Sequence, residues 1–239
     1  MTKMKLSIII PVYNEEKTIS VILDKVKNLT INGIEKEIII VDDGSTDNSK
    51  NILKSHVSKE MIIICHKKNS GKGAAVKTGI KNATGDFIVI QDADLEYDPN
   101  YLISLLVPIQ NATAKVVYGT RLKKMPKFAV NKNMPLFILH FYGNRFLSLV
   151  TSVLYGQWLT DMETCYKIFP RDAVKNMILR ARGFEFEPEI TAKLLKKGYK
   201  IVEIPIETIP RGHDEGKKLN TVKDGFTAFW TLFKYRHHD

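Results

Sequence analysis

The sequence contains very little cysteine. Cys65 and Cys165 are the only two among 239 residues, and neither belongs to a Cys-x-x-Cys or Cys/His pattern. This argues against a disulfide framework and against a metal site built on cysteine. We expect both to be reduced core residues of a cytosolic protein.

Acidic residues are also scarce relative to basic ones. The chain carries 36 lysines and arginines against 26 aspartates and glutamates, a formal net charge of +10. This excess implies an anionic partner, and the charge alone leaves open nucleic acid, an acidic membrane surface or a phosphorylated substrate. The remaining composition, 44% hydrophobic and 26% charged, is typical of a globular protein and excludes a mostly disordered chain.

The sequence lacks an uninterrupted apolar segment that could cross a membrane. Residues 134–155 are long enough, but Asn144 and Arg145 lie at the middle of this segment. A central arginine costs about 2.5–3.5 kcal/mol on insertion, so we expect a buried or interfacial helix instead. Residues 1–5 lead directly into a strand-like segment, which leaves no room for a cleavable signal peptide.

Apolar and amphipathic segments alternate along the first half of the chain. The apolar segments predict strands at residues 6–12, 37–41, 61–65, 87–91 and 116–118. The amphipathic segments predict helices at residues 16–29, 46–56, 73–83 and 99–109. Short connections between such elements favour an α/β fold with a mostly parallel sheet and right-handed crossovers. After residue 119 the alternation fades, and we expect a different layer packed on the first.

Polar and glycine residues collect directly after four of the predicted strands. In a parallel sheet the ligand lies beyond the carboxyl ends of the strands, so these loops are expected to share one cleft. The loops are residues 13–15, 42–45, 66–73 and 92–94.

Asp92 and Asp94 are the most informative pair in these loops, because they follow a strongly apolar strand and stand one residue apart. Two carboxylates so close repel each other unless a cation or a strong donor lies between them. Their oxygens suit Mg²⁺ or Mn²⁺, which proteins hold with one or two carboxylates plus substrate phosphates. The alternative is a solvated turn with helix-capping aspartates.

The glycine-rich segment at residues 69–75 lacks two known phosphate-binding patterns. A Walker loop needs a glycine where His66 stands and a serine or threonine where Gly73 stands. A dinucleotide fingerprint needs a glycine where Val76 stands. What remains is a turn with Lys72 at a helix N-terminus, suited to a diphosphate, or a plain helix-starting turn.

Motifs along nearly the whole chain resemble glycosyltransferase family 2. In the first half they are SIIIPVYNEE (7–16), VDDGSTD (41–47), NSGKGAAVKTG (69–79) and DAD (92–94). In the second half GTRLKK (119–124), TDMETCYKIF (160–169), GFEFEPEITAKL (183–194) and IPRGHDEGKKL (209–219) resemble the branch of dolichyl- and polyprenyl-phosphate mannosyl- and glucosyltransferases.

The resemblance implies a GT-A fold, with a mostly parallel central sheet and flanking helices in a single domain over residues 1–239. Residues 1–119 would form the nucleotide-sugar-binding half and residues 120–239 the acceptor-binding half. The implied reaction is inverting and metal-dependent. It would transfer a hexose from a donor of the GDP-mannose or UDP-glucose type to a polyprenyl or dolichyl phosphate.

The resemblance also assigns the donor side of the site. The residues expected to contact the nucleotide sugar are Pro11, Tyr13, Glu15, Asp43, Lys72, Asp92, Ala93 and Asp94. The divalent cation, Mg²⁺ or Mn²⁺, would be held on the diphosphate by Asp92 and Asp94. Glu96 stands where close relatives often carry a glutamine that joins the metal shell, so its place as a third ligand stays open.

On the acceptor side, Asp161 is the first candidate for a general base or an acceptor-positioning residue, and Glu163 is the second. The alternative for Asp161 is a capping role in a turn. Basic residues expected to grip an acceptor phosphate are Arg121, Arg211, Lys217 and Lys218, because the arginine fork suits phosphate. With Asp92, Asp94 and Asp161, Arg211 completes the catalytic set that we predict.

Two apolar segments, residues 135–155 and 226–235, could place the protein on the cytoplasmic face of a membrane. The second contains Phe229, Trp230 and Phe233; the alternative for both segments is ordinary core. Such a protein would bind the bilayer peripherally or through a membrane-embedded partner.

Two other functions stay open. The first is a family 2 enzyme that adds sugar to a glycan hydroxyl in capsule or lipopolysaccharide synthesis. The second is a basic, non-catalytic nucleic-acid-binding protein, although no recognised nucleic-acid motif occurs and we expect no nucleic-acid partner.

Overall fold

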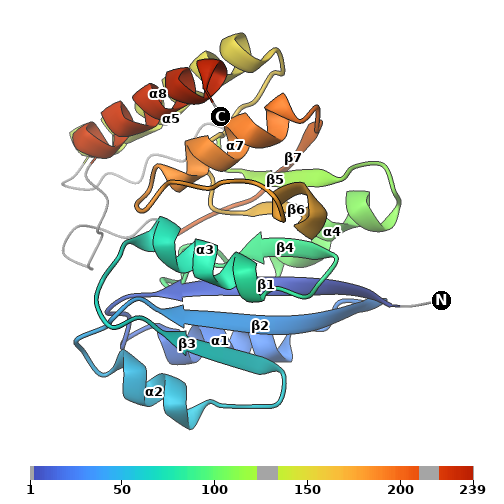
Figure 1. Cartoon of the computed structure of the whole chain (residues 1–239), viewed down its shortest axis with the longest axis vertical. Coiled ribbons are helices and arrows are strands. Elements are labelled where there is room, and N and C mark those ends of the chain that lie inside the picture. Colours follow the sequence, from blue (N-terminus) through green and yellow to red (C-terminus); the bar gives the residue numbers. More distant parts are fainter. Residues whose placement is uncertain (1–2, 123–133, 210–220, 239) are drawn as a thin grey trace.

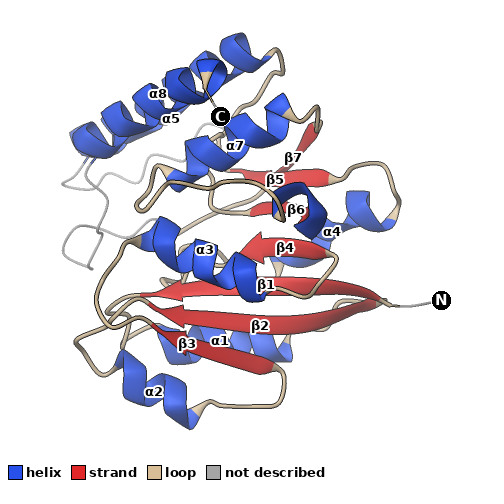
Figure 2. Ribbon diagram, in the orientation of Figure 1, coloured by secondary structure: helices blue, strands red, loops and turns tan. Residues whose placement is uncertain are grey.

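A seven-stranded sheet forms the centre of the molecule, whose computed structural model describes residues 3–122, 134–209 and 221–238. The strand order is β3-β2-β1-β4-β6-β5-β7 (Figures 1 and 2). The strands are β1 (Met4–Val12), β2 (Ile34–Asp42), β3 (Met61–Cys65), β4 (Phe87–Ile90), β5 (Val116–Thr120), β6 (Lys167–Pro170) and β7 (Ile201–Pro205). The sheet pairings are parallel except the two that β6 makes with β4 and β5. The predicted GT-A-type α/β sheet, mostly parallel in one domain, is confirmed.

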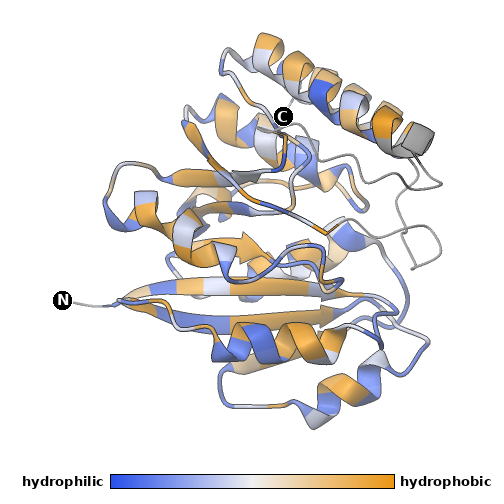
Figure 3. Ribbon diagram, turned by 180° about the vertical axis from the view of Figure 1, so that it is seen from behind, coloured by the Kyte–Doolittle hydropathy of each residue, from blue (hydrophilic) through white to orange (hydrophobic). Residues whose placement is uncertain are grey.

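Helices surround this sheet. They are α1 (Ile19–Asn28), α2 (Ser49–Ser55), α3 (Lys72–Asn82), α4 (Tyr101–Gln110), α5 (Met134–Tyr155), α6 (Arg171–Val174), α7 (Phe186–Lys196) and α8 (Thr221–His237). α3 and α7 lie over one face, and α1 and α4 lie over the other (Figures 1 and 3). The five strands and four helices predicted for the first half are all confirmed, with α1 and α2 each beginning three residues later than predicted.

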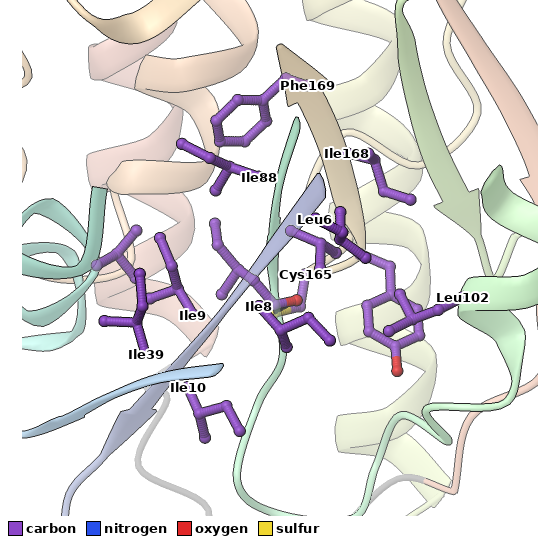
Figure 4. Packing of buried hydrophobic residues seen from close by; sticks show 14 of the residues in the cluster. Leu6, Ile8, Ile9, Ile10, Ile39, Ile88, Leu102, Cys165, Ile168 and Phe169 are labelled. Atoms are coloured by element: carbon purple, nitrogen blue, oxygen red, sulfur yellow. Dashed lines mark hydrogen bonds between the residues drawn. The ribbon is translucent and has the colours of Figure 1, made fainter. Parts of the chain in front are cut away.

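β1 lies at the middle of the core because its apolar run is buried on both faces. Ile8 pairs in register with Ile38 of β2 and with Val89 of β4, and all three side chains are fully buried. β-Branched residues fit such a strand, and burial on both faces explains the continuous apolar run in place of an alternating one. Figure 4 shows Ile8 and Ile9 among the side chains of neighbouring strands.

α3 packs unusually close to β1 because Gly79 faces the strand. A Cβ atom at this position would lie 2.4 Å from Cγ2 of Ile9. This close approach fixes the start of α3, and with it Lys72, at the edge of the sheet where β1 and β4 end.

The second half of the chain adds strands to the same sheet. β6 inserts between β4 and β5, where Ile168 is paired with Val89 on one side and Val117 on the other. β7 then continues the sheet beside β5. The expectation that the chain after residue 119 forms a different layer is therefore wrong for these strands. These strands are short and β6 is antiparallel, so this part of the sequence does not show the strand–helix alternation that predicts a parallel sheet.

α5 and α8 form a helix pair outside this sheet (Figure 1). The ring of Phe146 on α5 stacks on that of Phe229 on α8, with centroids 6.1 Å apart. The pair exposes a row of large apolar side chains, namely Leu139, Tyr142, Phe146, Leu149 and Val153 on α5 and Val222, Phe226 and Trp230 on α8. Figure 3 shows hydrophobic patches along this helix pair, with polar ones between them. Within the described ranges, no helix has both the length and the apolar character needed to span a bilayer.

The two cysteines differ in their surroundings. Cys165 is buried, as predicted, but Cys65 is exposed, so the prediction that it lies in the core is wrong. Cys65 is the last residue of β3, which is the edge strand of the sheet and is only partly covered.

Candidate active site

The carboxyl ends of β1, β2 and β4 meet at one edge of the sheet and open into a cavity of about 340 Å³. Ten of the residues predicted for the site line it: Pro11, Tyr13, Glu15, Asp43, Lys72, Asp92, Ala93, Asp94, Glu96 and Arg121. Asp161 lies behind the wall and is fully buried. Arg211, Lys217 and Lys218 lie outside the described residues. The predicted convergence of the strand-end loops is therefore found.

Asp43 holds the glycine-rich loop in place. Its carboxylate accepts hydrogen bonds from the backbone N–H groups of Ser70 (3.0 Å) and Gly71 (2.8 Å), and lies 2.6 Å from Nδ1 of His66. Gly71 has a φ of +96°, a conformation that favours glycine. The loop is thus fixed by a carboxylate from the neighbouring strand end, and its backbone is positioned beside Lys72.

Lys72 lies between two carboxylates at the floor of the cavity. Its Nζ atom is 2.7 Å from Oδ1 of Asp92 and 3.8 Å from Oε1 of Glu187. Burial disfavours the ammonium form, but the charges of Asp92 and Glu187 outweigh this effect and hold the pKa of Lys72 well above its ordinary value. Lys72 therefore carries a permanent positive charge into the site.

Asp94 and Glu96 form a second acidic position in the cavity wall. Leu95 between them adopts a positive φ of 65°, and Oδ1 of Asp94 accepts a hydrogen bond from the backbone N–H of Glu96 at 3.1 Å. Among the described residues, no group of three His, Cys, Asp or Glu side chains is arranged to hold a metal ion alone. The carboxylate oxygens are hard ligands that suit Mg²⁺ or Mn²⁺ once phosphate oxygens complete the shell.

Arg121 and Asp161 form a two-pronged ion pair at the cavity. Nε and Nη2 of Arg121 each lie 2.8 Å from a carboxylate oxygen of Asp161, and the backbone N–H of Arg121 donates a third hydrogen bond of 2.8 Å. Burial opposes the charge, but Asp161 raises the pKa of Arg121 well above its ordinary value. This geometry favours the positioning role predicted for Asp161, since its oxygens already hold Arg121.

Glu163 also lines the cavity, two residues beyond Asp161. Its Oε1 atom is buried and has no hydrogen-bond partner within the described part of the chain. Burial raises the pKa of Glu163 to about 7, and the charges of Lys167 and Arg121, which lower it, do not offset the burial. A carboxyl group in this state can hold or release a proton near neutral pH.

Asn69 and Gly71 also line the cavity and belong to the loop at residues 66–73 that was expected there. Other lining residues were not predicted, namely Val12, Ala75, Tyr97, His140, Cys165, Gly183, Phe184 and Glu187. Glu187 pairs with Lys72 and also with the fully buried Lys167. The signal for Glu187 was its place in the GFEFEPE motif, but the sequence does not indicate that the start of α7 folds back against α3.

A family model for glycosyl transferase family 2 matches residues 7–178 of the chain. A relative from Methanococcus voltae, a UDP-N-acetylglucosamine–dolichyl-phosphate N-acetylglucosaminyltransferase, is 34% identical and covers 94% of this chain and 93% of its own length. The glycosyltransferase AglJ of Haloferax volcanii is 25% identical over 95% of this chain and 70% of that protein.

Solved structures share the fold. Glucosyl-3-phosphoglycerate synthase from Mycobacterium tuberculosis, in complex with Mn²⁺, UDP and phosphoglyceric acid, superposes with a TM-score of 0.73. It is 16% identical, and the match covers 99% of this chain and 80% of that one. A second crystal structure of the same enzyme, with Mg²⁺ and UDP, gives a TM-score of 0.71.

Proposed function

The chain belongs to glycosyltransferase family 2, and on that premise we propose that it transfers a sugar from a nucleotide sugar to the phosphate of a polyprenyl or dolichyl lipid. The observation that carries this proposal is the composition of one cavity. Asp92, Asp94, Lys72 and Arg121 all line it. The carboxylates with Lys72 suit a diphosphate with its cation, and Arg121 suits a second anion.

On the donor side, Asp92 and Asp94 would hold Mg²⁺ or Mn²⁺ together with the diphosphate, and Glu96 is the candidate for a third ligand. When bound, the cation supplies charge stabilisation for the leaving diphosphate. Lys72 adds a fixed positive charge to this wall because Asp92 and Glu187 keep it ionised. Pro11, Tyr13, Glu15, Asp43 and Ala93 complete the proposed nucleotide-sugar side, which belongs to residues 1–119.

The proposal leaves two features of the donor to experiment, namely which sugar it carries and which base its nucleotide has. The sequence favours a GDP-mannose or UDP-glucose type of donor, whereas the Methanococcus voltae relative is named for UDP-N-acetylglucosamine. Hexoses and N-acetylhexosamines therefore both belong in the test.

On the acceptor side, Arg121 is the anchor proposed for the lipid phosphate. Its guanidinium is held by Asp161, so the fork is already oriented when an acceptor arrives. A phosphate is ionised at neutral pH, so direct displacement with inversion needs no strong base. Arg211, Lys217 and Lys218 remain proposed acceptor contacts, with Arg211 also in the catalytic set.

The test is incubation with radiolabelled UDP-N-acetylglucosamine, UDP-glucose and GDP-mannose, each with polyprenyl phosphate and Mg²⁺ or Mn²⁺. We expect label from one donor to enter the organic phase, and to stay in the aqueous phase when the lipid or the cation is omitted. Absence of organic-phase label with every donor would contradict the proposal.

The α5–α8 pair is the surface proposed to meet the membrane that holds such an acceptor. α5 contains no acidic residue, and α8 has Lys223, Lys234 and Arg236 against a single acidic residue, Asp224. Exposed apolar side chains with basic neighbours fit the cytoplasmic face of an anionic bilayer. Binding would be peripheral or assisted by a membrane-embedded partner, and the proposal includes no nucleic acid.

We predict that replacing Phe226 and Trp230 with serine lowers binding to anionic vesicles by about 100-fold or more, since each buried side chain contributes roughly 1.5–3 kcal/mol and about 1.4 kcal/mol is tenfold. Vesicle sedimentation measures the change. The control replaces Ile103 and Val107, which are also exposed but lie on α4. Equal losses in both double variants would contradict the assignment to α5 and α8.

A second candidate function, transfer to a glycan hydroxyl, is favoured by one observation. Glu163 lines the cavity with a pKa of about 7, which suits a general base for a hydroxyl group. An oligosaccharide acceptor in the same assay would then accept label, and Glu163→Gln would lose about 10²–10⁴-fold in rate.

A further inference from the structure

Glu163 and Asp161 stand two residues apart but differ in how their carboxyl groups are used. Asp161 is fully buried and holds Arg121 with both oxygens. Glu163 reaches the cavity, and its buried Oε1 atom has no hydrogen-bond partner among the described residues. A buried polar atom without a partner is costly, so such an atom on a residue that lines a cavity is a candidate for a ligand contact.

The charged groups around Glu163 come from every side of the cavity wall. Arg121, which follows β5, and Lys167 on β6 favour its ionised form, while Asp161 and Glu187 on α7 disfavour it. His140 on α5 is a further titratable residue that lines the cavity. The two cations are already engaged, Arg121 with Asp161 and Lys167 with Glu187.

An acceptor phosphate beside Arg121 would bring more negative charge to this wall. A phosphate dianion and an ionised carboxylate repel each other at short range unless a proton lies between them. The protonated form of Glu163 would instead donate a hydrogen bond to a phosphate oxygen and satisfy its own buried oxygen.

We propose that Glu163 recognises the acceptor by sharing one proton with its phosphate group, while Arg121 offsets the remaining charge. This inference rests on the proposed lipid-phosphate acceptor. In the transfer step, a phosphate oxygen forms a bond to the anomeric carbon, and the bond from that carbon to the diphosphate oxygen breaks. Its electron pair leaves with the nucleoside diphosphate, and the proton remains on Glu163. Glu163 is thus a positioning residue that selects phosphate.

The direct test is the uptake of protons on binding of a short isoprenyl phosphate, measured by calorimetry in buffers of different ionisation enthalpy. At about pH 8, one unit above the pKa of about 7, we expect the wild type to take up close to one proton. Glu163→Gln, which keeps an N–H donor without titrating, should take up almost none and bind at least as tightly. Equal proton uptake in both proteins would overturn the proposal.

A kinetic test uses the KM for polyprenyl phosphate across neutral to alkaline pH. The wild-type KM should rise about tenfold for each unit above the pKa, and the KM of Glu163→Gln should vary much less. Loss of kcat in this variant at every pH, with KM unchanged, would overturn the proposal and indicate a base for a hydroxyl acceptor. His140→Asn is the control and should keep the wild-type slope.

Two further outcomes are distinguishable. If Glu163→Gln fails to fold, Glu163→Asp keeps a titrating carboxyl on a shorter arm, and its proton uptake should remain. Failure to keep it would contradict the proposal. If the wild type transfers no sugar to lipid phosphate, the proposed function fails, whereas the calorimetry still reports on phosphate binding at Glu163.

Discussion

The two ends of the sheet hold glutamates in opposite states. Glu37, at the end where the strands begin, accepts hydrogen bonds from Ser7, Thr84 and Gly85, and lies 2.9 Å from Nζ of Lys5. Burial opposes its ionisation, but these bonds outweigh burial and lower the pKa of Glu37 to about 2.

Glu163, at the end where the strands finish, has a buried oxygen without a partner in the described structure and a pKa of about 7. The difference separates a carboxylate that stabilises the fold from one that we propose binds a ligand. A carboxylate whose oxygens are all satisfied by its own chain has nothing left to offer a ligand. One that the fold leaves incomplete can bind a ligand, at a cost in stability.

Asp94→Ala should have the largest effect at the end of the sheet that holds the cavity. Loss of this carboxylate, which we propose holds the metal ion, should lower transfer about 10³-fold, because a cation at a leaving diphosphate stabilises the transition state by several kcal/mol. The melting temperature should change little, since Asp94 is partly exposed. Steady-state rates with increasing Mg²⁺ and a thermal melt measure both effects. A stable variant with full activity would contradict the role of Asp94.

Variants of Arg121 test whether residues at the cavity end of the sheet also stabilise the fold. Arg121→Ala leaves the carboxylate of Asp161 buried without its partner, and should lower the free energy of unfolding by about 3–5 kcal/mol. Arg121→Lys keeps the charge but loses the two-pronged geometry.

The lysine variant should therefore stay folded and raise the KM for the acceptor about tenfold, with a smaller change in the KM for the donor. Urea unfolding and acceptor titrations separate the two effects. A similar rise in the KM for the donor and the KM for the acceptor would show that Arg121 does not act mainly on the acceptor.

The convergence of Asp43, Asp92 and Asp94 on one cavity could be predicted from the sequence because these residues follow long, strongly patterned strands. Asp43, Asp92 and Asp94 each come within four residues of the end of an apolar run that predicts a buried strand, and parallel strands bring their carboxyl ends together. Lys72 was placed in the same way, at the start of a helix. For these residues the local sequence pattern alone predicts their place at the edge of the sheet.

The wall that the second half of the chain contributes to the cavity could not be predicted to the same extent. Glu187 belongs to α7, and its contact with Lys72 depends on how residues 182 and 183 pack against the glycine-rich loop. Two short strands, β6 and β7, position this wall, and one of them is antiparallel. Asp161 was a candidate base because a sequence does not reveal that a carboxylate is fully paired. Only the contacts distinguish it from Glu163.

Glu37→Gln is the smallest perturbation and tests the other end of the sheet. At pH 7 the amide replaces a charged acceptor with a group that faces the same donors, so the free energy of unfolding should fall by about 2 kcal/mol. The turnover of sugar should not change, because Glu37 lies at the far end of the strands from the cavity. Urea unfolding and the transfer assay measure the two quantities.

The pH dependence of this variant gives the sharper result. The pKa of Glu37 is about 2 in the folded protein and 4.5 is its ordinary value, so ionised Glu37 stabilises the fold fully above about pH 4.5. This contribution is lost as the pH falls toward 2, because the unfolded chain binds the proton first. The stability difference between wild type and Glu37→Gln should therefore be constant from pH 7 to about 5 and shrink below it. A difference that persists undiminished at about pH 3 would mean that the amide harms packing, not charge, and that the two ends of the sheet differ less than their hydrogen bonds indicate.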